Sequence, residues 1–179
     1  MYGENGMDRE KIEDIFDIVY ETDALIVKAA EGKELSVCVE DLISIGMPAL
    51  PADYIEFLET ANGFAWNGFE FFGTYQVTVK KQGYVLRDIV SVNEEWHELK
   101  MGLEGKLVLG QFDDDIYIYD PEAGKYQELD NITLTEIDTY DSFDELFVGT
   151  VGLYTDFDDE EYSCDDEEDS FEDGASTGE

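Results

Sequence analysis

The chain has few basic residues. Its 179 residues include 10 lysines and arginines against 46 aspartates and glutamates, which gives a formal net charge of −36. Such a surface repels phosphate backbones and anionic membranes, so we expect no direct nucleic-acid binding and no membrane attachment. It attracts cationic partners instead, and electrostatic steering can raise association rates to about 10⁸–10⁹ M⁻¹s⁻¹ at low salt. Solubility is an alternative role for the excess acid, and composition alone favours the two equally.

Histidine and cysteine are also scarce, which limits the available catalytic chemistry. His97 is the only histidine, and it lies in the charged stretch 94–98, which is typical of an exposed helix flank. Cys38 lies between two valines and Cys164 lies in an acidic stretch, so the pair does not indicate a disulfide framework. We therefore expect no catalytic residues and no enzyme. The alternative is a hydrolase that uses carboxylates alone, which needs no histidine.

Long apolar runs and cofactor motifs are missing as well. No uninterrupted apolar run approaches a membrane span, and residues 1–6 lack the basic and apolar regions of a secretion signal, so we expect a cytoplasmic protein. The acidic stretches 113–115 and 156–161 do not have EF-hand spacing, and the glycines form no phosphate-binding pattern. We expect neither a metal site nor a cofactor.

The clearest element in the sequence is an amphipathic helix that begins at Pro51, a residue suited to the first helical turn. Its buried stripe has the i, i+3, i+4, i+7 spacing, at Tyr54, Phe57, Leu58 and Ala61. We expect Asn62-Gly63 to end this helix, because Asn-Gly readily adopts left-handed backbone. Residues 64–67 are then expected to form a loop before an aromatic strand.

Other segments also show clear periodicity. We expect helices over residues 8–21, with Asp8 as the cap, and 91–99, and a last helix from Ser142, which with Glu145 matches a capping box. The expected strands are residues 25–27, 35–39, 69–72, 76–79, 116–119 and 126–129. The first two surround residues 31–33 and are expected to form a hairpin. The last two flank residues 120–124, which are rich in turn formers.

Helices around hairpin-connected strands predict an α+β fold with a largely antiparallel sheet. An apolar content of 43% is enough for the core of one domain, which we place at residues 1–155. Residues 156–179 are almost wholly Asp, Glu, Ser and Gly, without lysine or arginine. Because such a composition buries too little apolar surface to offset ordering entropy, we expect a disordered acidic tail.

Several short motifs occur in a recognisable order. They are LPADYIEFL at 50–58, Asn62-Gly63, NGFEFFG at 67–73, LVLG at 107–110, DDD at 113–115, IYIYD at 116–120 and YDSFDELF at 140–147. Together they resemble the signature of the SUKH superfamily, which groups fungal cell-wall-assembly regulators with bacterial toxin-immunity proteins. The resemblance covers residues 45–150 and consists of packing and turn motifs.

The resemblance implies the same α+β architecture and a non-enzymatic protein-binding role. We expect an immunity protein that binds and occludes a cognate toxin domain, and a regulatory scaffold like the cell-wall-assembly members is the alternative. The acidic charge would complement the basic face of a nuclease-type toxin. As partner-binding residues we expect Trp66, Glu70, Asp113, Asp114 and Asp115, because a rigid aromatic anchor supplies contact area while charge supplies rate and orientation. The alternative is that the aromatic rings fill the core.

Overall fold

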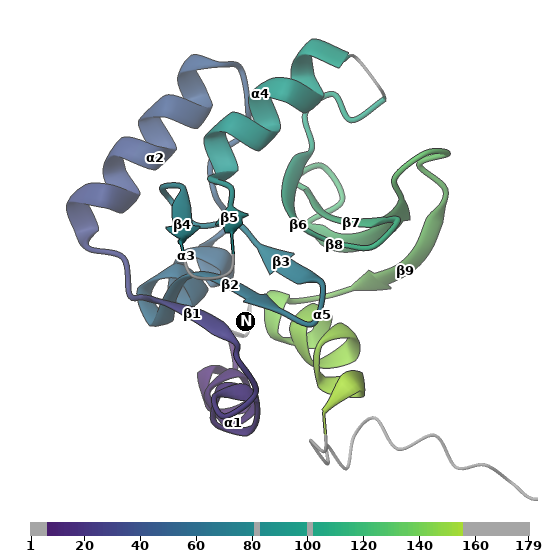
Figure 1. Ribbon diagram of the computed structural model, residues 1–179. Helices are drawn as coiled ribbons and strands as arrows, with labels where there is room; N and C mark the ends of the chain where they lie inside the picture. Colours follow the sequence, from purple (N-terminus) through teal and green to yellow (C-terminus); the bar gives the residue numbers. More distant parts are fainter. Residues whose placement is uncertain (1–6, 81–82, 100–101, 156–179) are drawn as a thin grey trace, which may run out of the picture.

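The computed structural model describes residues 7–80, 83–99 and 102–155 (Figure 1). Its helices and largely antiparallel sheet form an α+β fold, as predicted. The expected tail at 156–179 and Cys164 lie outside the described residues. No described helix has the length and apolarity needed to cross a membrane.

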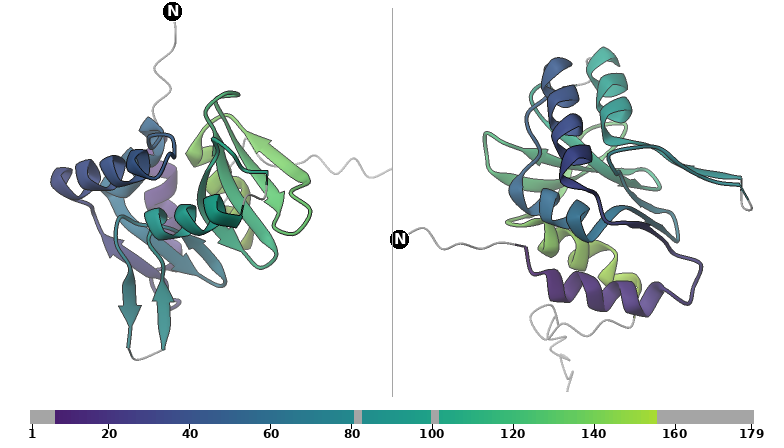
Figure 2. Two further views of the ribbon diagram at one scale, coloured as in Figure 1. Left: turned by 90° about the horizontal axis from the view of Figure 1, so that it is seen from above. Right: turned by 90° about the vertical axis from the view of Figure 1, so that its left-hand side faces the viewer.

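Seven strands form one sheet in which every neighbouring pair is antiparallel. In sheet order they are β1 (Leu25–Lys28), β2 (Ala61–Trp66), β3 (Phe69–Phe71), β6 (Leu107–Phe112), β7 (Asp115–Asp120), β8 (Lys125–Asp130) and β9 (Glu136–Tyr140). A separate hairpin consists of β4 (Val77–Val79) and β5 (Tyr84–Leu86). It is inserted between β3 and β6 and projects from the body of the protein (Figure 2).

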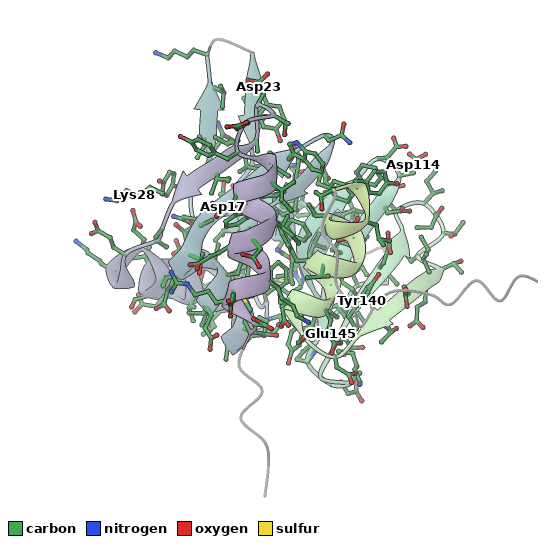
Figure 3. All side chains as sticks on the ribbon, turned by 90° about the horizontal axis from the view of Figure 1, so that it is seen from below. Asp17, Asp23, Lys28, Asp114, Tyr140 and Glu145 are labelled. Atoms are coloured by element: carbon green, nitrogen blue, oxygen red, sulfur yellow. The ribbon has the colours of Figure 1, made fainter. Side chains whose placement is uncertain are left out.

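The helices cover both sides of the sheet. They are α1 (Arg9–Val19), α2 (Gly32–Ser44), α3 (Ala52–Thr60), α4 (Ile89–Leu99) and α5 (Phe143–Thr150). Helices α2 and α4 lie side by side on one side, whereas α1, α3 and α5 lie on the other (Figure 2). Seen from below, α1 and α5 are neighbours beneath the sheet (Figure 3).

Aromatic rings fill the space between the sheet and α1, α3 and α5. Phe57 is fully buried at the centre, as its place on the helical stripe predicts. Its ring centroid lies 4.8–6.3 Å from those of Phe16, Tyr54, Phe71, Phe143 and Phe147. The hydroxyl of Tyr54 donates to the carbonyl oxygens of Phe72 (2.7 Å) and Leu109 (3.1 Å), so the one polar group of this ring is paired.

A carboxylate joins three elements at the edge of this core. Asp53, in the first turn of α3, accepts a hydrogen bond from the hydroxyl of Tyr126 on β8. Its second oxygen accepts from the backbone N–H of Phe143 at the start of α5, at 2.8 Å. Ser142 caps α5, as predicted, because its hydroxyl accepts from the N–H of Glu145.

The predicted hairpin at residues 25–39 is wrong in its second half. Residues 25–28 do form β1, but residues 35–39 belong to helix α2. The backbone N–H of Glu31 donates to the Glu34 carboxylate at 2.8 Å, which satisfies an otherwise free donor at the start of the helix. Leu35, Cys38 and Leu42 then lie on its buried face, and this burial outweighs the β preference of the valines.

The predicted helix end at Asn62-Gly63 and the predicted loop at 64–67 are also wrong. Helix α3 ends at Thr60 because Ala61 is already extended, and Asn62 and Gly63 begin β2. The buried Asn62 amide binds the backbone N–H and hydroxyl of Thr74, at 2.7 and 2.8 Å. Gly63 is required inside the strand for two reasons. Its φ of 111° is one that other residues rarely adopt, and a Cβ there would lie 2.9 Å from Leu86 Cδ2.

Candidate functional site

Two tight turns lie next to each other at one end of the sheet. Asn67-Gly68, with φ values of 49° and 93°, connects β2 to β3, which is the backbone that a two-residue hairpin turn requires. Asp113-Asp114 connects β6 to β7, and Asp113 has a φ of 52°. Because β3 pairs with β6 through Phe69 and Phe112, the two turns are neighbours. The sheet therefore brings the region of Glu70 close to the acidic turn.

Glu70 belongs to a row of cross-strand neighbours on one face of the sheet. The register pairs Leu25 with Ala65, Ala65 with Glu70 and Glu70 with Gln111. Residues directly opposite each other in a sheet share a face, so two apolar side chains, a carboxylate and an amide lie in line. This face is opposite to the one on which Phe71 packs into the aromatic core, because adjacent residues of a strand alternate.

The Glu70 carboxylate is fixed by two donors from other elements. The hydroxyl of Tyr84, on β5, donates to one carboxylate oxygen, and the side-chain amide of Gln111, on β6, donates to the other. Burial, followed by the hydrogen bond and charge of Glu70, raises the pKa of the Tyr84 hydroxyl, which therefore stays protonated and remains a donor. Each oxygen of Glu70 has a further lone pair free to accept.

A cavity of about 230 Å³ opens beside this carboxylate. Leu25 and Ala65 line it together with Glu70, Tyr84 and Asp23. No lysine, arginine or histidine is among its described lining residues, and neither Glu70 nor Asp23 forms an ion pair in the part of the chain that the structure describes. The cavity thus combines an apolar floor with two uncompensated carboxylates.

Trp66 also lines this cavity, but its indole ring has a structural contact. The residue is half-buried, and its ring N–H donates to the Thr22 hydroxyl at 2.8 Å. Trp66 pairs with Phe69, so its side chain leaves the strand on the face opposite to Glu70. The ring therefore holds the loop that precedes β1, which contains Asp23 with its positive φ of 61°.

The turn with Asp113, Asp114 and Asp115 is the most acidic part of this end of the sheet. Asp113 and Asp114 are exposed, and Asp115 is half-buried opposite Asp130 on β8. Partial burial, and then the charges of Asp130, Asp114 and Asp113, raise the pKa of Asp115. Figure 3 shows Asp114 at the outer end of the strands, far from Tyr140 and the start of α5. The turn therefore presents its charge outward.

Aromatic contacts support both turns. The rings of Phe69 and Phe112 stack with centroids 3.9 Å apart, and Tyr154 packs on both at 5.3 and 5.4 Å. Tyr154 itself is 56% exposed. Tyr84 and Gln111 had no signal in the sequence, because Gln111 meets Glu70 through the pairing of β3 with β6 and Tyr84 comes from the separate β4–β5 hairpin.

A second cavity, of about 180 Å³, lies between α4 and the segment that leads to β6. Its lining includes Met47, Trp96, Leu103 and His97. His97 is exposed, as expected for a helix flank. Within the ranges 7–80, 83–99 and 102–155, no three histidine, cysteine or acidic side chains are grouped closely enough to hold a metal ion. Asn93, Glu104 and Lys106 also line this cavity, so apolar and polar side chains share its wall.

Comparison with known proteins adds no assignment to this geometry. No family model matches the chain, and a search of the curated proteins gives no match.

Proposed function

We propose that this chain is a non-enzymatic protein-binding module, an immunity protein that binds a cationic toxin domain and occludes its basic face. The observation that carries the proposal is the juxtaposition of two turns, in which the acidic residues Asp113–Asp115 lie beside the strand that holds Glu70. The resemblance of residues 45–150 to the SUKH superfamily supports the immunity role. Such a protein would act in the cytoplasm, where a cell needs protection from its own toxin.

The distribution of charge supports a cationic partner at this end of the sheet. Residues 61–73 and 107–124 contain no lysine or arginine. In the described residues five cations pair with acids, and none of these pairs includes Glu70 or Asp113–Asp115. They are Arg9–Glu13, Lys28–Glu31, Arg87–Glu95, Lys106–Asp120 and Lys125–Asp141. Glu70 and the acidic turn therefore have no ion-pair partner among the described residues, and this local excess of acid attracts a basic surface toward the turns.

The mechanism is occlusion. Carboxylates of the acidic turn take the places of phosphates on the basic face of the partner, and the aromatic contacts around the turns keep that end of the sheet rigid. Rigid, preorganised groups lose little entropy when a complex forms. The exposed ring of Tyr154, beside the turns, supplies apolar contact area.

The experiment is capture of the partner by the full chain from the native host, followed by identification by mass spectrometry. We expect a basic toxin domain whose activity falls in proportion to bound protein, and capture that weakens as salt rises. The triple variant Asp113→Asn, Asp114→Asn, Asp115→Asn should capture less, whereas Glu94→Gln, Glu95→Gln, Glu98→Gln on α4 is the control with the same loss of charge. An acidic or uncharged partner, or equal capture by both variants, would reject the proposal.

A further inference from the structure

The geometry points to the Glu70 cavity as a socket for one arginine side chain of the partner. This inference rests on the proposed function for its partner, but it concerns a specific contact that the function does not require. The acidic turn supplies long-range attraction, whereas the cavity would supply recognition of a single side chain.

The size and the floor of the cavity fit an arginine. Leu25 and Ala65 are neighbours on the same face of the sheet and lead to Glu70, so the arginine methylenes would lie on apolar groups. Arginine commonly buries its methylenes against apolar surface while its charged head finds polar partners. The volume of about 230 Å³ accommodates one such side chain and no folded segment.

The carboxylate at the end of this floor keeps acceptor capacity on both of its oxygens. Tyr84 and Gln111 each occupy one acceptor position, on different oxygens of Glu70. One lone pair on each oxygen is left, and these two can receive the parallel N–H groups of a guanidinium. Lysine, a point charge with tetrahedral donors, does not match this fork.

Asp23 supplies a second carboxylate at the rim of the cavity. It is exposed, and it follows Thr22, which Trp66 holds through its ring N–H. Within the described residues no basic side chain neutralises Asp23 or Glu70. In this scheme Trp66 is a positioning residue: it fixes the loop that carries Asp23, and its ring does not make the floor of the socket.

The test uses the full chain labelled with ¹⁵N and three capped tripeptides, Gly-Arg-Gly, Gly-Lys-Gly and Gly-citrulline-Gly. Citrulline has the shape of arginine without its charge. We expect the arginine peptide to shift the backbone amide resonances of Ala65, Glu70 and Tyr84, while the indole resonance of Trp96 stays in place as an internal control. The lysine peptide should bind about fivefold more weakly and the citrulline peptide not measurably.

Two variants separate a socket from a general attraction of cations. Glu70→Gln keeps the size of the side chain and should weaken arginine-peptide binding about fivefold or more, because the charge-assisted pair is lost. Asp23→Asn should weaken it less, and Glu98→Gln, on α4, is the control of equal charge. Circular dichroism spectra and melting temperatures check that each variant folds.

Several outcomes would overturn the inference. Equal shifts with arginine and citrulline, lysine binding as tightly as arginine, or shifts centred on residues 113–115 with none at Glu70 would each reject an arginine socket. Unchanged arginine-peptide binding in Glu70→Gln would do the same. If the captured toxin binds wild type and Glu70→Gln equally, the socket is wrong while the proposed function stands. If the arginine peptide binds the cavity but no cationic partner exists, the function is wrong and the socket stands.

Discussion

The two faces of strand β3 carry opposite properties. Phe71 faces α1, α3 and α5 and contacts the rings of Phe57, Phe64 and Tyr117, all of them buried. Glu70, the residue before it, lines the cavity, and no described lysine, arginine or histidine forms an ion pair with it. Stability and the proposed binding thus reside in different side chains of the same strand, so single substitutions should be able to separate them.

The largest expected effect is on the aromatic core between the sheet and helices α1, α3 and α5. Phe57→Ala should lower the free energy of unfolding by about 3–5 kcal/mol, because it removes a fully buried ring and leaves a cavity. Urea unfolding measures the change. At temperatures where the variant is folded, its affinity for a cationic partner should equal that of wild type. Wild-type stability would show that Phe57 is not buried around α3 as described. A specific loss of binding would show that the two faces of β3 are not independent.

Asp53→Ala tests a polar link on the same side of the molecule. It should lower the free energy of unfolding by about 2 kcal/mol, because the buried hydroxyl of Tyr126 and the N–H of Phe143 lose their acceptor. Asp53→Asn, which retains an acceptor oxygen, should cost less, and the exposed Glu59→Ala on the same helix serves as the control. Thermal unfolding of the three variants measures the order of their stabilities. Equal melting temperatures for Asp53→Ala and Glu59→Ala would contradict the bridging role.

Alkaline pH should lower the free energy of unfolding, with the buried tyrosines of the aromatic core contributing to the decline. Burial raises the pKa of the Tyr54, Tyr117 and Tyr126 hydroxyls, so these groups stay protonated in the folded protein. Unfolded tyrosines lose their proton near pH 10. Above that pH the unfolded state therefore binds fewer protons than the folded state, and the free energy of unfolding should fall as pH rises.

The measurement is urea unfolding between about pH 8 and 11, across the usual titration range of tyrosine. Tyr117→Phe should give a shallower decline than wild type, since one of the raised groups is gone. A flat profile in wild type would mean that these hydroxyls are exposed to solvent and titrate normally.

Trp66→Ala has the smallest expected effect, and it acts on the loop that carries Asp23 at the rim of the cavity. Loss of its bond to Thr22 should loosen the loop that carries Asp23. The complex with a cationic partner should dissociate about fivefold faster, which corresponds to about 1 kcal/mol, while the association rate changes little. Surface-plasmon kinetics distinguish the two rates. The control is Trp96→Ala on α4, and equal dissociation rates for the two variants would remove Trp66 from the binding region.

The sequence predicted elements whose periodicity agrees with their burial. The stripe of α3 and the hairpin of β7 and β8 were expected because the spacing of their apolar residues fits only one type of element. Helix α2 was missed because Val37 and Val39 favour strands locally, although Leu35, Cys38 and Leu42 had helical spacing and Glu31 and Glu34 a capping pattern.

The candidate site was predictable only in part. Glu70 and Asp113–Asp115 stood out by charge and turn chemistry, and the sheet does bring them to one end. The partners of Glu70 were not predictable, because Tyr84 and Gln111 follow it by 14 and 41 residues. Gln111 meets it through the pairing of β3 with β6, and Tyr84 comes from the separate β4–β5 hairpin. The orientation of Trp66 depended on its register with Phe69, which sequence periodicity does not define.

One kinetic measurement on the acidic turn shows whether its carboxylates attract the partner. The association rate of the captured partner is recorded at several salt concentrations, for wild type and for Asp113→Lys, Asp114→Lys, Asp115→Lys. Charges on this turn act over about 8 Å at physiological ionic strength, so the wild-type rate should fall steeply with salt. The variant should associate more slowly and with a flatter salt dependence, while its melting temperature stays near that of wild type. Association that is independent of salt and equal in both proteins would contradict the account, and the excess acid would then serve solubility.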